Sequence, residues 1–201
     1  MAHPGNATSD PPLFWRVMAQ VDRVIGWVEN ATVAIGCIAL FVTMMLIFVD
    51  AACRYLFNSP LKVTTDLVNL YLLSTMLLLL LSFTFRRGGH ITVDLFAQRM
   101  PKRLYYGLIG ATLLCADVVV STMVHELLLF TRESWLNGET TIGIFAWPVW
   151  PSKAIVTAGL AVLAIRMLHA GISSLVASLT GNTTFAPSIA HGENEPVEEG
   201  V

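Results

Sequence analysis

The segment RRGGHITVDLFAQRMPKR, residues 86–103, decides how the rest of the chain is arranged. It holds five of the chain's Lys and Arg residues, and long apolar runs flank it on both sides. A Lys or Arg at the centre of a membrane helix costs about 2.5 to 3.5 kcal/mol. The segment is therefore predicted to lie at a water-facing surface between two membrane spans. On a short loop, such a cluster is typical of the cytoplasmic side.

The composition also places the chain in a bilayer. Hydrophobic residues make up 55% of it and charged residues only 13%, whereas soluble domains carry about 25% charged residues. The net charge of −2 gives no support for nucleic-acid binding, which requires a basic face. The three cysteines have no paired spacing, so neither a metal site nor a disulfide framework is predicted.

The apolar segments predict an all-α integral membrane protein with four transmembrane helices, because about 20 residues cross the hydrocarbon core. Two amphipathic interfacial helices are also predicted. One covers residues 14–28, where apolar residues recur every three or four positions and Arg16 and Arg23 form the polar face. The other lies in the central loop, around residues 93–100.

The chain is divided into three parts on this basis. The predicted membrane domain covers residues 13–172, between a disordered lead at 1–12 and a polar acidic tail at 173–201. Its spans are predicted at about residues 31–52, 67–85, 104–130 and 151–170.

Polar and aromatic residues mark the ends of the spans. Asp50 and Arg54 are four positions apart and are expected to pair on one helix face. Asn58-Ser59-Pro60 is expected to break the first span. The tryptophans between the third and fourth spans suit an interfacial belt: Trp135, Trp147 and Trp150. Lys153 and Arg166 are expected to extend to opposite membrane faces.

Basic residues beside the spans predict the orientation. With four crossings, both termini and the 86–103 loop share one side, which holds eight Lys and Arg residues against four on the other. The excess favours both termini in the cytoplasm.

Asp117, near the middle of the third span, is the strongest candidate for a functional residue inside the membrane. An intramembrane carboxylate suggests a proton or cation site, with Ser121 as a candidate partner. A self-contained four-helix proton-coupled exporter that uses Asp117 is therefore an alternative function. The other interpretation is a protonated or hydrogen-bonded Asp that holds two helices together.

Other chemistry has little support in the sequence. His125 and His169 are predicted at different depths, so one haem iron cannot bind both. No Ser/His/Asp set, phosphate loop or metalloprotease motif occurs. No enzyme is predicted, and no catalytic residue, cofactor or metal.

Three stretches resemble one family. RYLFNSPL at 54–61, RRGGHITVD at 86–94 and the segment from WPVWP at 147–151 into the fourth span are similar to the small permease subunit of TRAP (tripartite ATP-independent periplasmic) transporters, the DctQ-like family. One departure follows residue 61. The family usually has an aromatic and an acidic pair there, roughly W-x-E-E, and here only Asp66 remains as an acidic counterpart.

The resemblance implies a scaffold protein of the bacterial inner membrane. Its implied partners are a large permease subunit, which handles sodium and the organic-acid substrate, such as a C4-dicarboxylate, and a periplasmic substrate-binding protein. Arg86 or Arg87 is expected to hold anionic lipid headgroups, while His90 and Asp94 order the turn after them. The positions that match the family pattern, or are expected to shape it, are Arg54, Asn58, Pro60, Asp66, Arg86, Arg87, Gly88, His90 and Asp94.

Overall fold

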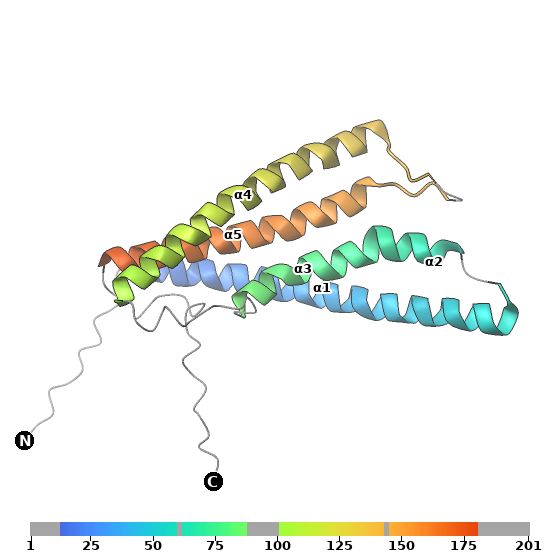
Figure 1. Ribbon diagram of the computed structural model, residues 1–201, viewed down its shortest axis with the longest axis horizontal. Helices are drawn as coiled ribbons and strands as arrows, with labels where there is room; N and C mark the ends of the chain where they lie inside the picture. Colours follow the sequence, from blue (N-terminus) through green and yellow to red (C-terminus); the bar gives the residue numbers. More distant parts are fainter. Residues whose placement is uncertain (1–12, 60–61, 88–100, 143–144, 181–201) are drawn as a thin grey trace, which may run out of the picture.

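The computed structural model describes residues 13–59, 62–87, 101–142 and 145–180, and these residues are almost entirely helical (Figure 1). The elements in order are α1 (Leu13–Phe57), α2 (Lys62–Leu67), the π-helical turn η1 (Val68–Leu72), α3 (Leu73–Arg86), α4 (Lys102–Asn137) and α5 (Trp150–Thr180). Four helical stretches among them are long and apolar enough to cross a membrane, with α2, η1 and α3 forming one of the four. The predicted all-α membrane fold is confirmed.

Helix α1 is longer than one membrane crossing. It runs without a break for 45 residues, about 68 Å at 1.5 Å per residue, against a hydrocarbon core of about 30 Å. The amphipathic stretch at 14–28 is therefore the first part of α1 and not a separate helix, because no helix-breaking residue separates it from the apolar run. The second predicted interfacial helix falls within 88–100, outside the described residues.

The helices lie in a row. Helix α4 packs chiefly on α5, α5 packs on α3, and α3 packs on α1, in the order seen from top to bottom in Figure 1. Half of the most apolar window of α5 is buried inside the protein, compared with 11 to 17% for the other three spans. Helix α5 is therefore the central helix, and the other three expose most of their apolar surface.

Glycines allow close approach where α5 meets its neighbours. A Cβ on Gly159 would lie 2.9 Å from the backbone oxygen of Leu78 on α3. A Cβ on Gly110 of α4 would lie 2.9 Å from the backbone nitrogen of Leu175. Small residues at such crossings are typical of membrane bundles, because van der Waals packing between backbones replaces the hydrophobic driving force.

The buried core lies where α3, α4 and α5 meet. Its buried members are Phe85, Leu163, Met167 and Ala170, with partly buried side chains of α3, α4 and α5 packed around them. Next to this core, α3 ends at Arg86. We call the end of the bundle that holds Arg23, Arg86, Arg87 and Arg166 the basic end, and the end that holds Trp135, Trp147 and Trp150 the tryptophan end.

Candidate functional site

A fully buried carboxylate joins three helices at the basic end. Glu29 of α1 has no exposed surface. Its Oε1 accepts a hydrogen bond of 2.8 Å from the Ser82 hydroxyl, and its Oε2 accepts one of 3.1 Å from Arg86 Nη1, both on α3. Arg166 Nε of α5 lies 3.7 Å from Oε1. A buried charge needs such partners, because an unpaired one is strongly unfavourable.

Arg166 is buried as well, with 6% of its surface exposed. Its Nη1 donates to Asp22 Oδ1 of α1 at 2.5 Å. The expectation that Arg166 extends to the membrane face is wrong, because two carboxylates of α1 hold its guanidinium inside the helix contact. Its Nε is buried and has no hydrogen-bond partner in the described part of the chain, since the Glu29 oxygen lies beyond hydrogen-bond length.

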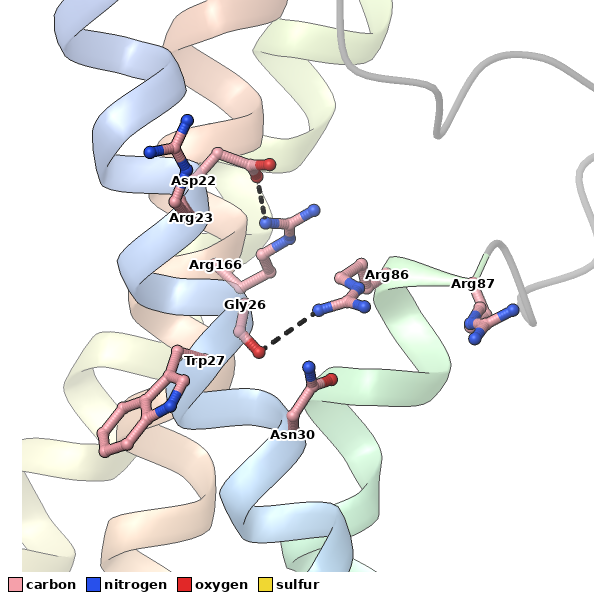
Figure 2. Close-up of a pocket in the computed structure, with 8 residues that line it drawn as sticks. All are labelled: Asp22, Arg23, Gly26, Trp27, Asn30, Arg86, Arg87 and Arg166. Carbon is pink, nitrogen blue, oxygen red and sulfur yellow. Dashed lines mark hydrogen bonds and ion pairs between the residues drawn. The ribbon is translucent and has the colours of Figure 1, made fainter.

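The adjacent arginines 86 and 87 point in different directions. Arg86 turns toward α1, where it also donates to the Gly26 carbonyl at 3.4 Å (Figure 2). Arg87 is exposed, and its guanidinium lies 5.1 Å from the centre of the Phe83 ring. Asp22, Gly26 and Glu29 are at positions i, i+4 and i+7 of α1, so they present one face to these cations.

A cleft of about 560 Å³ lies over the ion pairs. The residues that line it are Asp22, Arg23, Gly26, Trp27, Asn30, Arg86, Arg87 and Arg166 (Figure 2). Four of the eight are arginines and one is acidic. Chemically, the cleft is an arrangement of cationic hydrogen-bond donors around an open space, which suits an anion.

The tryptophan end is held together by a second set of polar contacts. Tyr71, in the π-helical turn, donates its hydroxyl to the Pro148 carbonyl at 2.5 Å, and its ring meets Trp147 edge to face. Trp135 and Trp150 also pack edge to face, 4.2 Å apart. The predicted tryptophan belt is thus a packed connection between α4 and α5 that reaches across to η1.

Glu139 stabilises this connection. Its Oε2 accepts hydrogen bonds from Lys153 Nζ at 2.8 Å and from the Ser134 hydroxyl at 2.7 Å. The hydrogen bond from Lys153, followed by that from Ser134, lowers the pKa of the Glu139 carboxyl below its usual value of 4.5. Glu139 therefore contributes stability above its unfolded pKa, and loses this contribution as the pH falls through the folded pKa.

We expect the connection at residues 138–150 to loosen in acid. Amide hydrogen exchange in this segment should rise below pH 4.5 in the wild-type chain, relative to exchange in the core of α5, after correction for the intrinsic pH dependence of exchange. In Glu139→Gln the segment should exchange faster already at neutral pH and show no further change in acid. Equal acid sensitivity in the two proteins would contradict this role of Glu139.

Asp117 is buried on α4, with 6% of its surface exposed. Its Oδ1 has no hydrogen-bond partner among the described residues. The side chain of Ser121, the candidate partner, is exposed, so the structure does not support that pairing. Asp117 is next to Ala116, which packs against the core around α5.

The two histidines of the haem hypothesis lie in unrelated places. His125 is exposed on α4, 3.8 Å from Glu126. His169 contacts the Met18 carbonyl of α1 at 3.2 Å. No group of three or more metal-binding side chains occurs within the described ranges.

The residues of the family pattern fall into two groups. Arg54 pairs with Asp50 at 3.3 Å, as expected. Asn58 follows the end of α1 with a φ of 51°, a left-handed conformation that Asn tolerates, so the predicted break is confirmed. Asp66 is half-buried in α2. These residues lie away from Arg86 and Arg87 at the basic end, whereas Pro60, Gly88, His90 and Asp94 are outside the described residues.

Three residues of this site, Glu29, Asp22 and Ser82, are not among those predicted from the sequence. The spacing of Asp22 and Glu29 contains a usable signal, because acidic residues seven positions apart share a helix face. The predicted amphipathic stretch ends at residue 28, one residue before Glu29. Nothing local to Ser82 distinguishes it from the other hydroxyl residues of its span.

A protein-family model matches the larger part of the chain. The family model described as tripartite ATP-independent periplasmic transporters, DctQ component, matches residues 43–177. No curated protein and no solved structure matches the chain. The matched range includes the whole of α3, α4 and the segments that carry both groups of pattern residues.

Proposed function

The chain belongs to the DctQ component family of tripartite ATP-independent periplasmic (TRAP) transporters, and on that basis we propose that it is the scaffold for a larger permease subunit. It is a small subunit of a TRAP transporter and a multi-pass membrane protein. In the proposal the larger subunit carries sodium and an organic acid, such as a C4-dicarboxylate. A periplasmic binding protein delivers that substrate.

The family match is the observation on which the proposal rests, and the arrangement of the helices supports it. A row of four spans with one central helix exposes broad apolar faces on α1 and α4, which suit contact with lipid and with another membrane protein. The exposed side chains on the middle of α1 include Ile35, Ile38, Phe41, Met45 and Phe48. The ion pairs between α1, α3 and α5 link these three helices at the basic end, as expected of a support.

We further propose that the protein lies in the bacterial inner membrane with the basic end in the cytoplasm. The excess of Lys and Arg on the side of the two termini supports this orientation. The tryptophan end then lies at the periplasmic face, where a binding protein docks on the transporter.

Uptake by reconstituted proteoliposomes tests the function. We expect a labelled organic acid to enter, with the binding protein and a sodium gradient present, only when this chain and the large subunit are reconstituted together. Omitting this chain should reduce uptake to the background of empty liposomes. Normal sodium-driven uptake by the large subunit alone would contradict the proposal.

The same system tests the exporter alternative. Its support is the buried Asp117 oxygen without a hydrogen-bond partner among the described residues. Liposomes that hold only this chain, with a proton gradient imposed, should be inert if the chain is a scaffold. Proton-coupled transport by the chain alone that disappears in Asp117→Asn would favour the exporter.

A further inference from the structure

The cleft at the basic end has more cationic donors than the described residues satisfy. A guanidinium carries five N–H donors. The hydrogen bonds of Arg86 and of Arg166 within the described residues use Nη1 alone. Arg166 Nε is buried and faces Glu29 Oε1 at 3.7 Å, so it is not accessible from the cleft. The Nη2 groups of both arginines form no hydrogen bond with the described residues, and they can donate to an acceptor from outside the chain.

The charges around the cleft are also unbalanced. Asp22 and Glu29 offset two of the four arginines, Arg86 and Arg166, with which they form ion pairs. Arg23 and Arg87 form no ion pair with any residue in the described part of the chain. Figure 2 shows them on either side of the Arg86–Arg166 pair. Counted over the described residues, the cleft therefore has two excess positive charges.

The surroundings of the cleft favour a phosphate group as the ligand. Guanidinium groups recognise phosphate oxygens through paired N–H donors, and a phosphate offers acceptors without donors. Trp27 lines the cleft with 74% of its surface exposed, as is typical of aromatic residues at the headgroup level of a membrane. Asn30 adds a neutral amide that can donate to the same group.

We propose that this cleft binds a phosphate group, supplied by the headgroup of an anionic phospholipid. The phosphate lies between Arg86 and Arg166, and Arg23 and Arg87 provide the excess positive charge at the rim. Arg86 thus belongs to the interior ion pairs as well as to the site, while Arg87 is the arginine of the pair that remains free for the lipid. The proposal depends on the membrane location of the chain and not on its role in transport.

Lipid titration of the full-length chain in detergent micelles tests the site. Native mass spectrometry gives the apparent Kd for the first phosphatidylglycerol bound, with phosphatidylcholine as the reference lipid. We expect the wild-type chain to prefer phosphatidylglycerol. The double variant Arg23→Gln/Arg87→Gln should bind it about 30-fold more weakly, since each surface cation contributes about a fivefold factor.

The matched control is Arg103→Gln/Arg132→Gln, which removes the same charge from exposed positions outside the cleft. Its phosphatidylglycerol affinity should stay within about twofold of wild type, a change too small to represent one lost contact. Equal weakening in the two double variants would overturn the proposal, because it would indicate diffuse attraction. A wild-type chain without preference for phosphatidylglycerol would overturn it as well.

Inorganic phosphate distinguishes the two sources of the group. If millimolar phosphate displaces phosphatidylglycerol from the wild-type chain, the site is supported and free phosphate can occupy it. If phosphate has no effect while the cleft variant still loses the lipid, the headgroup is the ligand. Circular dichroism melting should show that both double variants remain folded, since all four substituted side chains are exposed.

Discussion

Replacing Glu29 with alanine is expected to destabilise the bundle by about 3 to 5 kcal/mol, the usual cost of removing one partner from a buried ion pair. The substitution leaves Arg166, which has 6% of its surface exposed, with Asp22 as its single ion-pair partner among the described residues. It also removes the acceptor of the Ser82 hydroxyl and the carboxylate that holds Arg86 to α1. Unfolding by SDS in mixed micelles, followed by circular dichroism, measures the change.

The control for Glu29→Ala is Arg54→Ala. Arg54 also forms an ion pair, with Asp50 at 3.3 Å, but its side chain is 61% exposed. Exposed pairs of this spacing contribute about 0.3 to 0.5 kcal/mol. Glu29→Gln should fall between the two, because it keeps an acceptor for Ser82 but loses the charge. Equal stability of Glu29→Ala and Arg54→Ala would show that the buried cluster does not hold the helices together.

The second large effect is expected from Gly159→Val, which should cost about 2 to 3 kcal/mol. A Cβ at this position would lie 2.9 Å from the Leu78 oxygen and 3.0 Å from the Leu78 carbonyl carbon. Both are backbone atoms of α3, so relief of the clash requires α3 and α5 to separate. The same SDS titration measures the loss of stability.

Gly107→Ala is the matched control for this substitution. Its new Cβ would also lie 2.9 Å from a neighbour, but that neighbour is the Ser178 hydroxyl, a side chain that can rotate. The lost hydrogen bond from Ser178 to the Arg103 carbonyl costs about 1 kcal/mol, which the higher helix propensity of Ala roughly offsets. If Gly159→Val is as stable as Gly107→Ala, close contact between α3 and α5 is not required.

The residues of the family pattern have different structural roles at different positions. Asn58 follows the end of α1 in a left-handed conformation, which Asn adopts more readily than most residues. Arg54 is paired within its own helix. Arg86, in contrast, is placed by a contact with Glu29, 57 positions earlier in the chain. The roles of Asn58 and Arg54 could be explained from the sequence because one depends on the residue itself and the other on a residue four positions away. The partner of Arg86 could not be found in this way.

Asp117 and Glu29 show why intramembrane charge is hard to interpret from sequence. Asp117 is predicted as a functional site because it interrupts an apolar run, yet it has no charged partner in the described part of the chain. Glu29 lies where a polar helix face passes into an apolar one and resembles an ordinary end-of-span residue. It is the fully buried member of the cluster because α3 and α5 cover that face of α1. The residues next to Glu29 in the sequence do not indicate that this face will be covered.

The amino-acid sequence alone predicts the membrane class, the four spans, the break at Asn58 and the separation of basic and tryptophan-rich ends. Each of these follows from the spacing of residues along one helix or at one boundary. Packing between the helices placed Arg86, and not Arg87, against α1, and it paired Arg166 with Asp22, 144 positions away. It also brought the cleft together from α1, α3 and α5. These features depend on which faces of the helices are in contact. Close packing between segments that are distant in the sequence determines those contacts.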